Sequence, residues 1–442
     1  MAAEHGRIEA RLSTFDTAMV VFSLVVGIGI FRTPAIVAQA TGERGLFYAA
    51  WVIGGVASLI GAFTFAEIGA RHPRAGGYYR VVADCYHPAL AFALNWSQTL
   101  MQGAGAAGVA LIGAEYLVPV VLPAAWRTPR APLVLACATM LVLLLLNYRG
   151  VRLGARTQNL LSLLKIAMIC ALALTAFAIA PHATEAPAPA GPWPPRLATA
   201  LIPCFYAFGG YQLTMNLGGD VRDAGRRLPR AITLGMLTVI ALYLLLNLAY
   251  ERVLGIAGIA SSQLVAAALS RALFGRFAEV VVSVAIFLSA AGFVNATIMQ
   301  MPRGLMAMAE DRVLPQAFRR VNASTQTQEA ALLFFGATLL LPAFVLGSFE
   351  NLMNYVMATD TVTLAVVAST LFVLRRRGAA TAGFVMPGYP LLPALYLLAL
   401  LVVAVSVFAA TPAVALGALV ILVAGGPLYL LGRRLFGGAP AG

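Results

Sequence analysis

Two glycine clusters interrupt apolar segments at matching depths. Gly27-Ile28-Gly29 lies thirteen to fifteen residues after the expected start of one segment near 14, and Gly209-Gly210 lies twelve and thirteen residues after the expected start of another near 197. Glycine destabilises a helix and permits local unwinding, and the amides freed at the start of the following half-helix attract a carboxylate. Glycines also allow close helix packing, but paired breaks at equal depth favour a binding site.

Two charged residues lie deep within other apolar segments. Lys165 is the only lysine of the chain and lies ten residues into the segment 155–180. An ammonium at that depth in a membrane is energetically unfavourable and usually functional, although a structural tether between helices would also explain it. Asp360 lies eight residues into the segment 352–374. Because burial disfavours the charged carboxylate, Asp360 is a candidate for proton coupling; a hydrogen bond to a neighbouring polar residue is the alternative.

Three further charged residues lie close to the expected membrane boundaries. Arg32, just beyond the first glycine cluster, could meet an acidic ligand, reach the membrane surface or pair with Glu115. Asp220 and Glu67 lie at segment ends beside arginine-rich loops. We expect these two carboxylates to form structural ion pairs or to hold a gate closed.

The elements that must position these residues are membrane helices. Of 442 residues, 61% are hydrophobic and 11% are charged, and the mean hydropathy is +0.87. A soluble protein carries about a quarter charged residues, and a spanning helix needs about 20 apolar residues. The sequence therefore predicts an all-α polytopic membrane protein with twelve spans, at residues 14–39, 46–70, 88–120, 131–147, 155–180, 197–218, 231–250, 273–308, 328–347, 352–374, 388–409 and 412–432.

The basic residues indicate the orientation of these spans. If the N-terminus is cytoplasmic, the segments on that side hold 21 of the 30 Lys and Arg residues, the segments on the other side hold 7, and the spans hold 2. Such an excess marks the cytoplasmic side of a membrane protein. We therefore expect both termini in the cytoplasm and the protein in the inner (plasma) membrane. The net charge of +13 is thereby assigned to topology and not to nucleic-acid binding.

A Pro- and Ala-rich linker divides the chain. It covers 181–196 and separates five predicted spans from the next five, a division typical of inverted-repeat transporters. The expected parts are a cytoplasmic N-terminus, a first repeat, the linker on the outer side, a second repeat, two further helices and a cytoplasmic C-terminus, at 1–13, 14–180, 181–196, 197–374, 388–432 and 433–442. In such folds the binding site lies near the membrane midplane, where helices are interrupted.

Four motifs, in order along the chain, carry a resemblance to a known family. They are VVGIGIFRTP (25–34), FAEIGARHPRAGGYYR (65–80), FYAFGGYQLTMNLGGDVRDAGRRLPRAI (205–232) and PRGLMAMAEDRVLPQAF (302–318). Together they resemble the amino acid–polyamine–organocation (APC) superfamily, and within it the bacterial relatives of the L-type amino-acid transporters. The resemblance implies the five-plus-five inverted-repeat (LeuT-like) fold, with discontinuous helices 1 and 6.

The resemblance also implies a binding site for an amino acid. The substrate's α-carboxylate and α-amine would contact the chain at the two breaks, at Val26, Gly27, Ile28, Gly29, Ile30, Phe205, Tyr206, Phe208, Gly209 and Gly210. Tyr206 matches an aromatic residue that closes over the substrate. Lys165 matches a helix 5 lysine whose ammonium replaces the sodium ion of sodium-coupled relatives, which implies sodium-independent transport. Ile28 departs from the family's small residue and adds bulk beside the site.

The residue types near the breaks predict the substrate class. No acidic residue lies near either glycine cluster in the sequence, and the side chains there are mostly apolar or aromatic. A small neutral amino acid is therefore the expected substrate of an exchanger or facilitator. A proton-coupled symporter and a non-transporting amino-acid sensor on the same fold are the alternatives.

Other classes of function lack the residues that they need. The sequence shows no cofactor motif, metal cluster or nucleophile–base pair, so we expect no enzyme and no bound cofactor or metal. Animal relatives in the L-type branch bind a glycoprotein through a cysteine between helices 3 and 4. The corresponding loop, 121–130, contains no cysteine, so we expect no disulfide-linked accessory subunit.

Overall fold

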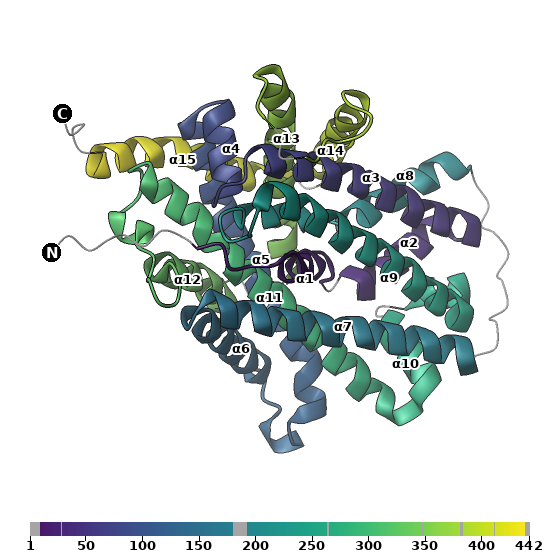
Figure 1. Cartoon of the computed structure of the whole chain (residues 1–442). Helices are drawn as coiled ribbons and strands as arrows, with labels where there is room; N and C mark the ends of the chain where they lie inside the picture. Colours follow the sequence, from purple (N-terminus) through teal and green to yellow (C-terminus); the bar gives the residue numbers. More distant parts are fainter. Residues whose placement is uncertain are drawn as a thin grey trace.

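Long helices make up the structure, a computed structural model that describes residues 9–27, 29–179, 192–262, 265–345, 349–380, 383–410 and 412–437 (Figure 1). Up to the linker, the helices are α1 (Thr14–Val25), α2 (Gly29–Thr41), α3 (Arg44–Arg71), α4 (Gly77–Cys85), α5 (Pro88–Val121), α6 (Ala131–Tyr148) and α7 (Val151–Ile179). After the linker come α8 (Trp193–Ala207), the 3-10 helix η2 (Tyr211–Asn216), α9 (Ala224–Ser261), α10 (Val265–Phe274), α11 (Ala278–Glu310), α12 (Glu329–Val345), α13 (Phe349–Arg376), α14 (Leu391–Ala410) and α15 (Pro412–Phe436).

The apolar helices account for the predicted spans. Seven of the described helices are individually long and apolar enough to cross a membrane, and α1 with α2 forms an eighth span, bent by 46° at the break. Shorter apolar stretches lie in α12 and α14, and α8 with η2 and α13 cover the sequence ranges of the other two predicted spans. The prediction of an all-α polytopic fold with discontinuous helices 1 and 6 is thus confirmed. The shorter helices α4 and α10 lie between spans.

Helix α1 lies at the centre of the bundle (Figure 1). It begins at a capping box, in which the Ser13 hydroxyl accepts from the amide of Asp16 at 3.1 Å and the Asp16 carboxylate accepts from the amide of Ser13 at 2.9 Å. From Thr17 to Val25 every residue is buried, as expected for a helix that is apolar on all sides. It packs against α7, α9, α11 and η2.

Helix α9 extends beyond the span predicted from hydropathy. The apolar span was expected at 231–250, whereas the helix begins at Ala224 and includes Arg226 and Arg230 in its first two turns. Backbone hydrogen bonding continues past the membrane boundary because a helix can carry charged side chains into the interfacial region. At its other end α9 is kinked at Gly255, whose φ of 64° is left-handed, and continues to Ser261.

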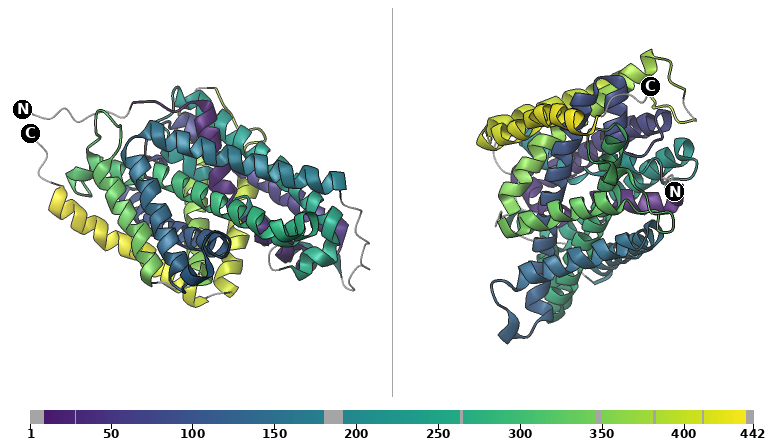
Figure 2. Two further views of the ribbon diagram at one scale, coloured as in Figure 1. Left: turned by 90° about the horizontal axis from the view of Figure 1, so that it is seen from below. Right: turned by 90° about the vertical axis from the view of Figure 1, so that its left-hand side faces the viewer.

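Buried ion pairs connect helices at one end of the molecule. The described part of the chain begins and ends at this end (Figure 1 and Figure 2), which we call the terminal side. The fully buried carboxylate of Glu67, near the end of α3, accepts from Arg375 of α13 at 2.6 and 2.8 Å and from Arg71 at 2.7 Å. It also accepts from the amide of Met386 at 2.8 Å, so Glu67 ties the α13–α14 connection to α3.

Two further ion-pair groups join α11 to its neighbours on the terminal side. Arg303 donates to both carboxylate oxygens of Asp220, at 2.9 and 3.1 Å, and both side chains are buried. Arg80 of α4 pairs with Asp311 at 2.6 Å and with Glu310. Burial lowers the pKa of the Arg80 guanidinium, but these two carboxylates outweigh it and raise that pKa above its ordinary value. These ion pairs therefore join α4, α11 and the segment before α9 on this side.

The Asp220–Arg303 pair predicts a large effect on stability. Asp220→Asn leaves the buried Arg303 guanidinium without its counter-charge, which should destabilise the protein by about 3 kcal/mol. Asp84→Asn is the control, because Asp84 is half exposed and pairs with His72, and exposed pairs contribute about 1 kcal/mol or less. Thermal unfolding in detergent should show a clearly larger decrease in Tm for Asp220→Asn; equal decreases would contradict this account.

Candidate functional site

The two helix breaks, between α1 and α2 and between α8 and η2, lie against each other. A Cβ atom added to Gly210 would lie 2.4 Å from the carbonyl oxygen of Leu24, and one added to Gly29 would lie 3.8 Å from Cα of Ala207. Gly210 also has a φ of 116°, which residues with a Cβ rarely adopt. The fold therefore brings together the two glycine clusters that are far apart in the sequence. Ile28 lies outside the described residues.

One tyrosine hydroxyl contacts both breaks. Tyr243 of α9 is fully buried, and its hydroxyl lies 3.1 Å from the carbonyl oxygen of Val25 and 3.2 Å from that of Ala207. Both carbonyls lie at helix C-termini, where the donor of the next helical turn is missing; the Val25 carbonyl also accepts from the amide of Gly27 at 2.9 Å. Phe208 is fully buried and packs its ring 5.0 Å from that of Tyr243 and 5.8 Å from that of Trp51, so it supports this side of the break.

The ammonium of Lys165 lies at the end of α1. It donates to the carbonyl oxygen of Val26 at 2.5 Å and to that of Ser289, on α11, at 3.3 Å. The Ser289 hydroxyl lies 3.1 Å from the carbonyls of both Val26 and Gly27. In the described part of the chain Lys165 is 0% exposed and has no acidic partner. The negative end of the α1 dipole therefore supplies its electrostatic complement.

A series of buried polar side chains runs from Lys165 toward the terminal side. Ser162, three residues before Lys165, shares a hydrogen bond of 2.8 Å with Ser23 of α1. Gln158 donates to the Ser162 hydroxyl at 3.2 Å, and Asn295 of α11 donates to Gln158 at 2.8 Å. Asn147 of α6 in turn donates to Asn295 at 2.7 Å. We call this series, with Asn147, the polar ladder. Its hydrogen bonds connect α1, α6, α7 and α11 to one another.

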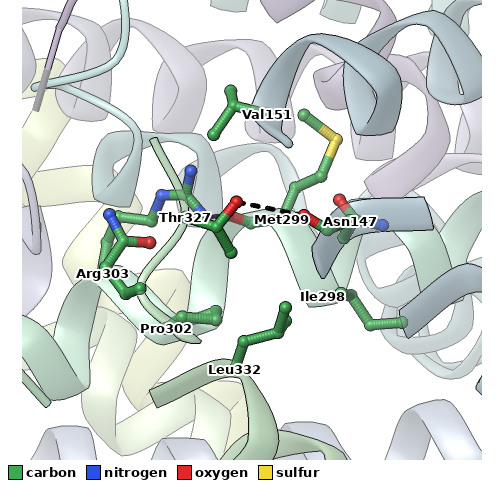
Figure 3. A pocket seen from close by; sticks show the side chains of 9 residues that line it. Asn147, Val151, Ile298, Met299, Pro302, Arg303, Thr327 and Leu332 are labelled. Carbon is green, nitrogen blue, oxygen red and sulfur yellow. Dashed lines mark hydrogen bonds between the residues drawn. The ribbon is translucent and has the colours of Figure 1, made fainter. Parts of the chain in front are cut away.

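A small cavity lies at the terminal-side end of the polar ladder (Figure 3). Its lining includes Asn147, Met299, Arg303, Thr327 and Gln328, and the Thr327 hydroxyl donates to the carbonyl of Asn147 at 3.2 Å. Its space suits about one water molecule, and among the described residues neither polar atom of the buried Gln328 amide has a hydrogen-bond partner. The cavity is too small for an amino acid and does not touch the breaks.

Asp360 lies on α13, across from α5. Gln98 of α5 donates to its carboxylate at 2.6 Å. This partner lies on another helix, whereas the sequence analysis considered only polar neighbours of Asp360 in the sequence. Tyr78 of α4, which lies between spans, is fully buried close by. Burial, and then the charge of Asp360, raise the pKa of Tyr78 well above its ordinary value. The carboxylate thus lies in a largely apolar and phenolic environment.

The other predicted site residues occupy varied positions. Val26 and Ile30 are fully buried, Phe205 and Gly209 are partly buried, and a Cβ on Gly27 would lie 3.9 Å from the ring of Phe293. The side chain of Tyr206 lies outside the described part, so its predicted gating role stays a prediction. Arg32 is exposed on α2.

Three residues of the site had escaped the sequence analysis. Tyr243 lies within an apolar span, where tyrosine is common and gives no signal. Ser289 and Gln98 are polar residues within long apolar segments, and a polar residue at membrane depth is itself a sign of function or helix contact. That sign could have identified both, although not their partners.

Comparison with known proteins identifies the family of the chain. The sequence pattern of the amino acid permease family matches residues 12–426. The chain belongs to this family. The permease is 26% identical to the serine/threonine exchanger SteT of Bacillus subtilis over 402 residues, covering 89% of this chain and 90% of that protein.

Two human transporters are similar over most of their length. The permease is 26% identical to the Asc-type amino acid transporter 1 over 441 residues, covering 98% of this chain and 84% of that protein. It is also 26% identical to the large neutral amino acids transporter small subunit 2 over 424 residues, covering 92% of this chain and 77% of that protein. The relation to the L-type transporters is thereby confirmed.

The contact between the breaks predicts opposite outcomes for two glycines. Gly210→Ala should abolish amino-acid uptake, because its methyl group would overlap the Leu24 carbonyl and its φ disfavours any residue with a Cβ by about 1 kcal/mol or more. Gly29→Ala should retain uptake, since its methyl group makes ordinary contacts, whereas Gly29→Leu should abolish uptake in a folded protein. Uptake by purified variants, matched for yield and Tm, checks this; full uptake by Gly29→Leu would remove the break from the site.

Proposed function

We propose that the permease exchanges small neutral amino acids across the inner (plasma) membrane, without sodium and by alternating access. In this proposal both termini are cytoplasmic, so the terminal side faces the cytoplasm. The two repeats comprise 14–180 and 197–374. The single observation that carries the mechanism is the hydrogen bond from the Lys165 ammonium to the Val26 carbonyl. This ammonium occupies the end of α1, where a sodium-coupled transporter would need an ion.

The polarity of the breaks supports an amino acid as the substrate. The amides in the first turn of α2, which begins at Gly29, form the positive end of that helix's dipole and suit a carboxylate. The Ala207 carbonyl, at the end of α8, accepts from the Tyr243 hydroxyl, and its second lone pair suits an ammonium group. An α-amino acid carries both charges on one carbon, so one molecule can use both helix ends at once. The apolar side chains of Ile30 and Phe205 nearby favour a neutral side chain on the substrate.

The relatives narrow the substrate class in the same direction. One is a serine/threonine exchanger by name and another is a transporter of large neutral amino acids. None of these names specifies a charged side chain. The proposal therefore takes neutral amino acids, with those bearing small side chains first, and exchange as the mode of transport.

Lys165 predicts the behaviour of the exchanger. In sodium-free proteoliposomes, uptake of labelled neutral amino acids should be well above background only when the vesicles are preloaded with unlabelled amino acids. Lys165→Met leaves the Val26 carbonyl with the Ser289 hydroxyl but without its ammonium donor, and should lower exchange by about tenfold or more. Leu164→Met, an exposed neighbour on the same helix, is the control. A Lys165→Met protein that exchanges normally, or a wild type that requires sodium, would refute the proposed mechanism.

Asp360 supports a second candidate, proton-coupled symport. Its carboxylate lies within the bundle with Gln98 as hydrogen-bond partner, which suits a group that binds and releases a proton. If the permease is a symporter, an inward proton gradient drives accumulation in empty vesicles and Asp360→Asn abolishes it. We expect instead that Asp360→Asn leaves exchange unchanged in vesicles without a gradient. Ligand binding without any flux in either assay would indicate a sensor.

A further inference from the structure

Tyr396 extends from a helix outside the two repeats to the break between α8 and η2. It lies on α14 and is only 3% exposed. Its hydroxyl lies 3.0 Å from the hydroxyl of Tyr211, the first residue of η2. Its ring centroid lies 6.1 Å from that of Phe205, in the last turn of α8. A single side chain of α14 therefore contacts the chain both before and after the break.

The two phenols, Tyr211 and Tyr396, fit against a glycine of α3. A Cβ added to Gly61 would lie 2.0 Å from the Tyr211 hydroxyl and 2.5 Å from a ring carbon of Tyr396. One turn further along α3, the ring of Phe65 packs edge-on against both, with centroids 6.1 and 6.4 Å away. We call Tyr211 and Tyr396 the phenol pair. Gly61, Phe65 and, from α8, Phe205 therefore hold the phenol pair in one position.

The chain segment that leads to Tyr396 is also anchored. The connection that leads into α14 is tied to α3, because the Met386 amide donates to the buried Glu67 carboxylate at 2.8 Å. Glu67 in turn binds Arg375 of α13. Tyr396 therefore projects from a part of the protein that is anchored by a buried ion pair, whereas Tyr211 directly follows the break, after Gly210 with its left-handed φ.

We propose that Tyr396 is a positioning residue for the substrate site. Its hydroxyl holds Tyr211, and with it the break between α8 and η2, in the described conformation, and so contributes to substrate affinity. A buried hydroxyl without a partner is unfavourable in a membrane protein, so the bond resists any movement of η2 away from α14. The effect on affinity rests on the proposed function; the hold on the break does not.

The hold on the break is tested by amide hydrogen exchange of the whole protein in detergent, read in peptides that cover 205–216. Tyr396→Phe removes one hydrogen bond and should raise exchange there about fivefold, with little change elsewhere. Tyr429→Phe is the control: Tyr429 is a buried tyrosine on α15 whose ring packs on His87 and Phe92, and its removal should leave 205–216 unchanged. An unchanged 205–216 in Tyr396→Phe, or an equal rise over all peptides, would overturn the proposal.

The effect on affinity is tested by exchange in proteoliposomes. Tyr396→Phe and Tyr211→Phe should each raise KM about fivefold, and the double variant should raise it no further, because either change removes the same bond. Additive effects, or an unchanged KM, would overturn this half of the proposal. If the wild type shows no exchange of any amino acid, the proposed function fails, and the hydrogen-exchange result alone decides the role of Tyr396.

A second variant tests the fit without changing either phenol. Gly61→Ala should displace the phenol pair and raise hydrogen exchange in 205–216 at least as much as Tyr396→Phe. Gly45→Ala lies on the same helix, where an added Cβ meets no atom within 4 Å, and should have no effect. If Gly61→Ala leaves 205–216 as protected as in the wild type, the phenol pair does not position the break.

Discussion

The need to satisfy backbone groups at the broken helices governs the arrangement of the rest of the bundle. A break within a membrane exposes carbonyls and amides that have neither water nor a helical partner, and each unsatisfied group is unfavourable by several kcal/mol. Here the carbonyls that end α1 and α8 are met by Tyr243 from α9, Lys165 from α7 and Ser289 from α11. Three helices are therefore fixed around α1 by the polar groups of its own end.

The same contacts divide the electrostatics of the break. The carbonyl end of α1 is already complemented by the Lys165 ammonium, so the charge there does not depend on a dissolved ion. The amide end at the start of α2 receives no comparable charge from Lys165. Under the proposed function, a substrate carboxylate complements the first turn of α2, and the Lys165 ammonium accounts for the independence from sodium.

The sequence predicted the kinds of groups at the site better than their partners. Glycine spacing located both breaks, and the single lysine marked the centre, because these signals are local or compositional. The partners Tyr243 and Gln98 lie 218 and 262 residues from the groups that they bond. Only the tertiary fold brings such pairs together, so no local pattern announces them. Hydropathy likewise located the spans, but it placed the start of α9 too late, since it detects lipid contact and not helical hydrogen bonding.

Helix α3 links the candidate site to the ion pairs of the terminal side. Near its middle, a Cβ on Gly54 would lie 2.9 Å from Cβ of Cys204 on α8, and Gly61 faces the phenol pair. Near its end, Glu67 binds Arg375 of α13. Small residues allow this close approach of helices in a membrane, but such close packing also leaves little room for independent movement. Any conformational change that separates α8 and η2 from α3 must break contacts that are continuous with the ion pairs of the terminal side. Under the proposed function, opening that side and rearranging the substrate site are therefore coupled through α3, which is what alternating access requires.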